Sequence, residues 1–409
     1  MFGMLKQIAG LRIPYALAVY DNHEINRVVS VLKEHREAMG KETAEFEKNV
    51  AKAFGKRYGI MVNSGSSANL LALELLDLPK GSEVITPVLS FSTTVSPIIK
   101  MGLTPIFVDT ESGKYTIDVN LLEKAITKKT KAIFFPHLVG NVPDMKRILK
   151  IAKKYKLFVI EDSCDTFGAK YDKKPTGYYS DITTTSFYGS HLITAGGNGG
   201  MIMVNKPEWQ RKLKMLRGWG RSSSIFNESE DITKRFSKKI RNTAYDAKFI
   251  FAEIGYNFLP NEMGAAFGNE QLKKFPKFSK TRKYNFKRLL KFFKQYESLF
   301  ILPKQDPKTD TSWLAFPLVI KENSPFTREK LVRYLETNNV QTRPVLTGNI
   351  LEQPGFVSLR KKWNPQKFPI ANEVMERGFL IGCHHGMEEK HLKRLEELFT
   401  TFLKPYLNN

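Results

Sequence analysis

The feature that most restricts the fold of this chain is the alternation of strand-like and helix-like segments through its first two-thirds. Short apolar runs alternate there with segments in which apolar residues recur at helical spacing. This alternation predicts an α/β fold with a mostly parallel sheet covered by helices on both faces. Each expected helix is followed by an expected strand, at residues 68–78 and 83–87, 95–101 and 105–109, 121–125 and 132–135, and 145–155 and 158–162.

The pattern changes in the last third of the chain, which we expect to form a smaller α+β domain. Its expected elements are a strand at 313–320, a helix at 327–337, a short strand at 340–343 and a final helix at 388–402. The sequence therefore predicts an N-terminal arm at 1–12, a large domain at 13–270, and a small domain with its linking helix at 271–409.

The chain is strongly basic, with 64 Lys and Arg residues against 41 Asp and Glu residues and a formal charge of +23. One interpretation is nucleic-acid binding, and the other is a lysine-rich composition whose charges lie on solvated surfaces. The densest run of lysines, 273–294, also carries apolar residues at helical spacing, which is typical of an amphipathic helix. We therefore favour the second interpretation and expect no nucleic-acid partner.

Two further features restrict the compartment and the cofactors. The sequence has no apolar run as long as the roughly 18 residues that a membrane helix needs, and residues 1–7 lack the apolar core of a signal peptide. We therefore expect a cytoplasmic protein with no membrane partner. The two cysteines, Cys164 and Cys383, are far apart in the sequence and cannot supply the four thiolates of a conventional iron–sulfur cluster.

Three motifs contain candidate functional residues, and one of them follows an expected strand. Residues 63–69 form a turn of small residues before a helix, which either binds an anion such as phosphate or simply caps that helix. Residues 160–165 place acidic side chains after an apolar strand, where they could hold a ring nitrogen or a metal or cap the next helix. Residues 186–191 end in a histidine before a glycine-rich turn, and this histidine is either a base or a satisfied polar residue.

Together, the order and spacing of these motifs resemble the DegT/DnrJ/EryC1/StrS family of sugar aminotransferases. The resemblance begins near Ile13 and extends to the C-terminus, and it implies the fold-type I architecture of aspartate aminotransferase with pyridoxal phosphate (PLP) as cofactor. Further segments also match the family, at residues 39–42, 87–94, 140–145, 255–257 and 262–268.

The resemblance also implies how the cofactor phosphate is held. The turn formed by Gly65, Ser66 and Ser67, together with Ser186, would bind the phosphate. Asn257 would complete this site from the second subunit of a homodimer.

Other residues of the resemblance would hold the cofactor ring. Asp162 would pair with the pyridinium nitrogen and keep it protonated, so that the ring withdraws electrons. Phe91 would stack on the ring face. Asp165 lies where many relatives carry Gln or His near the phenolic oxygen.

The chain departs from the family at His191, where the aminotransferases carry the lysine that binds the cofactor covalently. A histidine cannot form that bond, so PLP or its amine form, pyridoxamine phosphate (PMP), would be held without a covalent link. The imidazole has an ordinary pKa of about 6.5 and is suited to moving protons near neutrality.

Histidine at this position resembles the 3-dehydratases of dideoxysugar pathways, which remove the C3 hydroxyl of a nucleotide-linked 4-keto-6-deoxyhexose. One kind of these enzymes acts on CDP-sugars with an iron–sulfur cluster, and the other acts on GDP-4-keto-6-deoxymannose without one and takes its amino group from glutamate. Two cysteines exclude the cluster, so the cluster-free kind is the closer match, with a role in deoxysugar and lipopolysaccharide O-antigen synthesis. The alternatives are a sugar aminotransferase that works without the lysine and a non-catalytic ligand-binding protein.

Five residues are candidates for substrate binding. Arg217 and Arg221 belong to the stretch 217–224, after which the chain lacks the cysteines that the cluster-containing enzymes carry there. Arg343 and Asn349 belong to a segment that resembles both kinds of 3-dehydratase, and Arg343 either pairs with diphosphate oxygens or forms a surface ion pair. His384 is assigned to substrate contact or packing, because no carboxylate cluster accompanies it to form a metal site.

Overall fold

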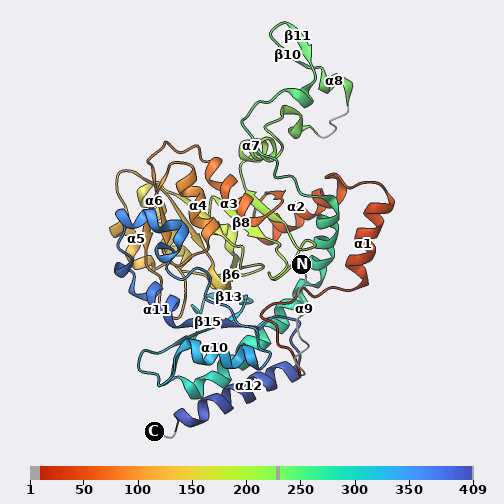
Figure 1. Cartoon of the computed structure of the whole chain (residues 1–409). Coiled ribbons are helices and arrows are strands. Elements are labelled where there is room, and N and C mark those ends of the chain that lie inside the picture. Colours follow the sequence, from red (N-terminus) through yellow and green to blue (C-terminus); the bar gives the residue numbers. More distant parts are fainter. Residues whose placement is uncertain (1–9, 227–230, 408–409) are drawn as a thin grey trace.

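The computed structural model describes residues 10–226 and 231–407. A seven-stranded sheet forms the centre of the large domain, in the order β1-β9-β8-β5-β4-β2-β3 (Figure 1). The contacts between β5 and β8, β4 and β5, β2 and β4, and β2 and β3 are parallel, whereas β9 is antiparallel to both of its neighbours. The strands are β1 (Tyr58–Val62), β2 (Glu83–Pro87), β3 (Thr104–Val108), β4 (Thr130–Pro136), β5 (Phe158–Asp162), β8 (Ile182–Ser186) and β9 (Gly200–Val204).

Apolar residues on both faces of the sheet explain why helices cover both sides. On β4, Ala132 and Phe134 pack into one core with helices α3 and α7, while Ile133 and Phe135 pack into another with α5 and α6. Because successive side chains of a strand point to opposite faces, this alternation buries the strand completely. The helices of this domain are α1 (Asn22–Lys33), α2 (Lys41–Ala53), α3 (Gly65–Glu74), α4 (Ser92–Lys100), α5 (Val119–Ala125), α6 (Met145–Tyr155) and α7 (Pro207–Arg217).

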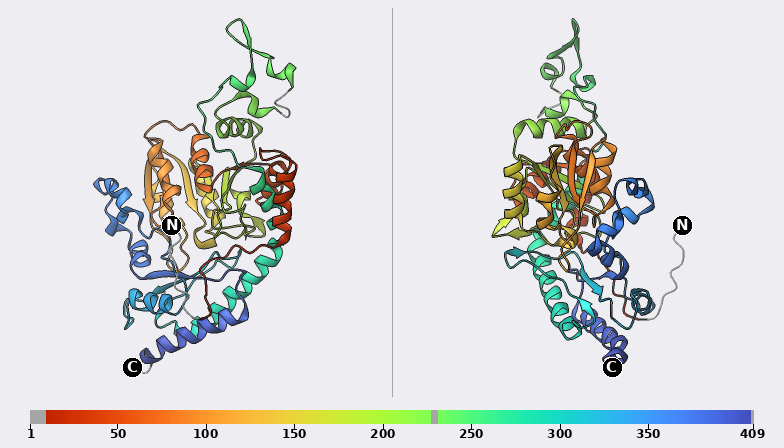
Figure 2. Two further views of the ribbon diagram at one scale, coloured as in Figure 1. Left: turned by 45° about the vertical axis from the view of Figure 1, so that its right-hand side comes forward. Right: turned by 90° about the vertical axis from the view of Figure 1, so that its left-hand side faces the viewer.

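The small domain is built on an antiparallel three-stranded sheet, in the order β12-β14-β15. Figure 2 shows that α9 runs from the large domain into this domain and that α12 lies on its outer side. A second short sheet, β13-β6-β7, joins segments that are far apart in the sequence. The elements are β6 (Lys170–Tyr171), β7 (Lys174–Pro175), α9 (Glu262–Phe293), β12 (Phe300–Ile301), β13 (Thr309–Asp310), β14 (Phe316–Ile320), α10 (Arg328–Thr337), α11 (Pro369–Arg377), β15 (Gly378–Ile381) and α12 (Glu389–Leu403).

The observed architecture confirms the predicted fold class. The expected strand at 340–343 is reduced to isolated bridges, from Val340 to Ile13 and from Arg343 to Leu380. Helix α9 continues through the proposed boundary at 270/271, so one helix belongs to both domains. Most of the predicted N-terminal arm, residues 1–9, lies outside the described residues. Within the described ranges, none of the helices has the length and apolar character needed to cross a membrane.

A segment between α7 and α9 projects away from the sheet (Figures 1 and 2). It contains α8 (Ile232–Arg235) and the hairpin formed by β10 (Lys238–Ile240) and β11 (Thr243–Tyr245). Large apolar side chains along this segment are exposed to solvent, among them Phe249, Phe251 and Ile254, the last at 95%. An exposed apolar surface of this kind is typical of a contact with another protein.

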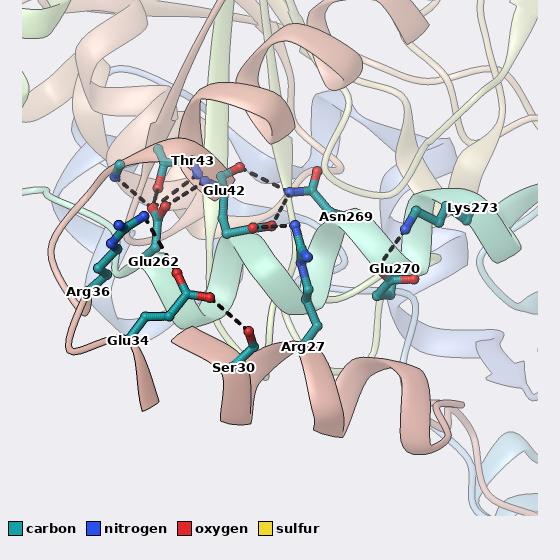
Figure 3. Close-up of polar contacts among 11 residues, drawn as sticks. Arg27, Ser30, Glu34, Arg36, Glu42, Thr43, Glu262, Asn269, Glu270 and Lys273 are labelled. Carbon is teal, nitrogen blue, oxygen red and sulfur yellow. Dashed lines mark hydrogen bonds and ion pairs between the residues drawn. The ribbon is translucent and has the colours of Figure 1, made fainter. Parts of the chain in front are cut away.

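A buried carboxylate joins α9 to the N-terminus of α2 (Figure 3). Glu262 accepts hydrogen bonds from the backbone N–H groups of Gly40 (2.8 Å), Glu42 (2.5 Å) and Thr43 (3.1 Å), and from the Thr43 hydroxyl (2.6 Å). The carboxylate thus satisfies N–H groups that have no partner within α2, and its charge is favourable at a helix N-terminus. This contact unites two segments, 39–42 and 262–268, that the sequence matched to the family separately.

We expect Glu262→Gln to lower the free energy of unfolding by about 2–4 kcal/mol. The glutamine side chain has no negative charge, and its NH₂ group would face N–H groups that also donate. Urea unfolding followed by circular dichroism measures this change. Glu270→Gln is the matched control, since Glu270 lies on the same helix and pairs with the largely exposed Lys273, a contact worth less than about 1 kcal/mol. Equal losses in the two variants would contradict the proposed role of Glu262.

Candidate active site

A cavity of about 640 Å³ opens where β1, β2, β4, β5 and β8 end. In a parallel sheet, ligands bind at this edge, outside the carboxyl ends of the strands. Residues from all three sequence motifs line the cavity, and the small domain closes it from the other side through segment 343–347 and Gln353. The lining residues predicted from the sequence are Gly65, Ser66, Phe91, Asp162, Asp165, Ser186, His191 and Arg343.

The small-residue turn places the N-terminus of α3 at the cavity. The Ser64 hydroxyl caps this helix by accepting from the Ser67 N–H at 3.1 Å, so the first N–H groups, those of Gly65 and Ser66, lie at the cavity edge. A Cβ atom on Gly65 would lie 2.6 Å from Cβ of Ser186, so only glycine fits there. The turn and Ser186 together form an anion site at a helix N-terminus.

Asp162 is nearly buried at the end of β5 and is held on both oxygens. Its Oδ2 accepts hydrogen bonds from Asn69 Nδ2 (2.8 Å) and from the Thr94 hydroxyl (2.7 Å), and its Oδ1 accepts from the Cys164 N–H (3.1 Å). These contacts fix the carboxylate in one orientation at the cavity wall, where it can bind a protonated ring nitrogen.

His191 lies in the cavity with its side chain 16% exposed. Its Nδ1 is 3.4 Å from the backbone oxygen of Ser186, and its Nε2 is 3.9 Å from Oδ1 of Asp165. Burial lowers the pKa of His191 to about 4, since the charged imidazolium is poorly solvated. The imidazole is therefore neutral near pH 7 and available as a base.

The environment of Asp165 shifts the pKa of its carboxyl group upward, opposite to the shift of His191. Burial raises the pKa of Asp165 to about 7, although the Val139 N–H donates to its Oδ2 at 2.9 Å. Burial in the cavity therefore shifts the pKa values of both Asp165 and His191 toward the neutral forms. Perturbed groups of this kind are typical of catalytic sites.

Of two further residues predicted to bind the cofactor, Phe91 lines the cavity and Asn257 does not. The ring of Phe91 is 49% exposed and lines the cavity, as stacking on a ligand requires. Asn257 is exposed and lies beside Gly218, outside the cavity of its own chain. The role predicted for Asn257 from the family resemblance therefore requires a second copy of the chain, and it stays a prediction.

The substrate assignments of Arg217 and Arg221 need correction within the single chain. Arg217 is buried, and its guanidinium donates to Glu47 (2.6 Å) and to the backbone oxygen of Met61 (2.7 Å), which are structural contacts. Arg221 stacks over the ring of Trp219 at 4.2 Å, outside the cavity. Arg343, in contrast, is exposed and lines the cavity, and its guanidinium donates to the backbone oxygen of Thr342 at 2.7 Å.

Asn349 and His384 also lie outside the cavity. Asn349 is buried, and its amide donates to Asn372 (2.7 Å) and to the backbone oxygen of Pro365 (3.2 Å). His384 is buried, with Nε2 3.0 Å from the backbone oxygen of Pro14. Burial lowers the pKa of His384 to about 4, so this side chain packs as a neutral residue. Of the two alternatives stated for His384, the contacts favour packing.

Sequence reasoning missed several residues of the site. Asn69 and Thr94 lie inside recognised motifs, and the need of a buried carboxylate for hydrogen-bond donors could have indicated them. Tyr15 also lines the cavity, but a single tyrosine near the N-terminus has no spacing or pattern that points to a site.

The fold is that of the fold-type I, PLP-dependent enzymes, and the comparisons agree. The sequence profile of the DegT/DnrJ/EryC1/StrS aminotransferase family matches residues 19–399, and the chain belongs to this family.

Two relatives and one solved structure are informative. The chain is 35% identical over 397 residues to dTDP-4-dehydro-2,6-dideoxy-D-glucose 3-dehydratase of Saccharopolyspora spinosa, covering 94% of this chain and 85% of the relative. It is 33% identical over 394 residues to GDP-4-keto-6-deoxy-D-mannose 3-dehydratase of Yersinia pseudotuberculosis, covering 94% and 97%. A crystal structure of GDP-4-keto-6-deoxymannose-3-dehydratase with a trapped PLP–glutamate geminal diamine superposes with a TM-score of 0.86 at 30% identity, covering 94% and 99%.

The ligand-free protein offers a direct test of the environment of His191. With a pKa of about 4, His191 contributes stability that is full above about pH 6.5 and is lost as the pH falls toward 4. The raised pKa of Asp165 acts in the opposite sense, with stability lost as the pH rises from about 4 through 7. We expect the imidazole ¹⁵N resonances of His191, identified by their absence in His191→Asn, to remain those of a neutral ring down to about pH 5. A midpoint near the ordinary 6.5 would contradict the burial of this side chain.

Proposed function

We propose that this protein is a PLP/PMP-dependent 3-dehydratase of a nucleotide-linked 4-keto-6-deoxyhexose, with GDP-4-keto-6-deoxymannose as the substrate. The observation that carries this proposal is a neutral imidazole, His191, in the cavity where the family resemblance places a covalently bound lysine. The fold, the cavity and both relatives named as 3-dehydratases support it.

The residues of the cavity fit a PLP-type cofactor. The N-terminus of α3 and Ser186 would hold the phosphate, and the absence of space for a side chain at Gly65 suits the close approach of an anion. Asp162 would bind the ring nitrogen, and Phe91 would cover one face of the ring. When bound in its amine form, the cofactor supplies an electron sink for carbon–oxygen bond cleavage at C3 of the sugar.

The Nε2 atom of His191 would accept the proton that is removed during the reaction and would later return it. Its neutral form predominates at neutral pH because its pKa is about 4, so no deprotonation step precedes its use as a base. The imidazolium that forms would be stabilised by Asp165, whose Oδ1 atom lies 3.9 Å away and whose pKa of about 7 allows it to be ionised. The remaining contact, from Nδ1 to the Ser186 oxygen, orients the ring.

The polar groups at the mouth of the cavity suit a sugar nucleotide. Arg343 is exposed at the rim, and a guanidinium binds diphosphate oxygens in a bidentate manner. Glutamate is the proposed amino donor, because PLP and glutamate are trapped together in the similar crystal structure. An iron–sulfur cluster has no place in this proposal, since burial raises the pKa of both thiols, Cys164 and Cys383, and two thiols are too few.

The site is also proposed to be shared between the two subunits of a homodimer. Asn257 is exposed and does not line the cavity of its own chain, and Phe251 and Ile254 of the same segment are also exposed. In a symmetric dimer each subunit presents the same surface to the other, so each would complete the phosphate site of its partner.

The activity is tested by incubating the protein with PLP, glutamate and GDP-4-keto-6-deoxymannose and following product mass and ammonia. We expect a 3-deoxy product with release of ammonia. His191→Asn should bind PLP with nearly unchanged affinity but lose dehydration by at least about 100-fold, the typical contribution of a general base. His23→Asn, at a side chain that is 75% exposed, is the matched control and should remain active.

Two outcomes would contradict the proposal. A 4-amino sugar as the main product would identify an aminotransferase that works without the lysine. Retained turnover in His191→Asn, with the product unchanged, would remove the imidazole from the reaction.

The shared site is tested by mixing subunits. His191→Asn and Asn257→Asp should each be nearly inactive alone, because the second change repels the cofactor phosphate. After refolding as a mixture, half of the dimers carry one intact site, so activity should recover to roughly a quarter of the native value. Failure to recover, with mixed dimers present by mass spectrometry, would place both residues in the same subunit's site.

A further inference from the structure

Tyr15 lies in the cavity although the proposed chemistry assigns it no role. Its position is fixed by contacts with the small domain on either side of its backbone. Its N–H donates to Oε1 of Gln341 at 3.0 Å, and the backbone oxygen of the preceding Pro14 lies 3.0 Å from Nε2 of His384. The phenol is therefore held in place by the N-terminal segment rather than by the cofactor-binding motifs.

Two charged residues that line the cavity, Arg343 and Asp165, lie near enough to Tyr15 to influence it. The guanidinium carbon of Arg343 is 5.7 Å from the centre of the Tyr15 ring. Burial, and next the negative charge of Asp165, raise the pKa of Tyr15 well above its ordinary value. Tyr15 therefore keeps its proton at working pH and is a hydrogen-bond donor rather than an acid.

The hydroxyl of Tyr15 is available to a ligand. Among the described residues, no group is hydrogen bonded to it, and the hydroxyl is not sealed within the protein, unlike that of Tyr115. A polar group in a largely buried position costs free energy unless it finds a partner. A bound substrate oxygen would supply that partner.

The groups that we assign to the two ends of the substrate indicate which sugar oxygen Tyr15 would contact. In the proposed substrate, C1 carries the diphosphate, which Arg343 would bind, and C4 reacts beside His191 and Asp165. The sugar carbons between these ends are C2 and C3 on one edge and C5 with the ring oxygen on the other. The C3 hydroxyl leaves during the reaction, so it cannot be a lasting partner. The C2 hydroxyl lies on the same edge, next to the diphosphate, and remains in the product, so it is the acceptor that we assign.

We infer that Tyr15 donates a hydrogen bond to the C2 hydroxyl of the sugar and makes the enzyme selective for 2-hydroxy over 2-deoxy substrates. This inference rests on the proposed function and adds the specificity of the same site. The distinction is meaningful in this family, because the two named relatives act on sugars that differ at C2. A site built around a substrate hydroxyl discriminates strongly against an analogue that lacks it.

The test compares Tyr15→Phe with the native enzyme on GDP-4-keto-6-deoxymannose and on its 2-deoxy analogue. We expect kcat/KM to fall about tenfold for the first substrate and less than about twofold for the second, because only the first loses a hydrogen bond. Phenylalanine keeps the ring and its packing against Arg343. Tyr20→Phe is the matched control, since Tyr20 lies five residues further along, is 53% exposed and is outside the cavity. It should behave as the native enzyme.

An equal fall for both sugars, or no change for either, would overturn the inference. If the native enzyme dehydrates neither sugar, the proposed function fails while the inference is still tested by calorimetric titration of the PLP-loaded protein with each sugar nucleotide. Tyr15→Phe should then bind the 2-hydroxy sugar about tenfold more weakly and the 2-deoxy sugar with unchanged affinity. Unaltered affinity for the 2-hydroxy sugar, or no binding of either sugar, would overturn it.

Discussion

Burial of both faces of the parallel sheet is the constraint on which the rest of the structure depends. Strands buried on both faces, such as β4, are apolar on both sides, and the connections from β2 to β3 and from β4 to β5 cross over a face as the helices α4 and α6. Strands β1, β2, β4, β5 and β8 consequently end at the same edge. The polar residues at these strand ends converge on one cavity.

Desolvation then determines the chemistry at that edge. The cavity lowers the pKa of His191 and raises that of Asp165, so both groups are closer to neutral than in water. A lysine in the same place would need to become a neutral amine before it could react. A neutral imidazole is already a base, and the proposed role of His191 without a covalent link to the cofactor requires no change of fold.

The small domain and the N-terminal segment supply the part of the cavity to which we assign substrate selection. Arg343 reaches the rim because its segment bridges β15, and Tyr15 enters because its backbone is bound to Gln341. Arg217 has the same charge as Arg343, yet its guanidinium is used inside the large domain to bind Glu47. The role of each of these arginines therefore depends on its place in the fold rather than on its charge.

The sequence by itself determined the alternation of helices and strands, the fold class, and the motifs that we propose to hold the phosphate and the ring nitrogen. These properties follow from local patterns, since the strand ends and helix starts of a parallel sheet are encoded within a few neighbouring residues. Only the tertiary structure decided that Asn69 and Thr94 hold Asp162, that Arg217, Asn349 and His384 are packing residues, and that Tyr15 lines the cavity. Each of these depends on contacts between distant segments, and no local pattern of residues specifies which distant group a side chain will meet.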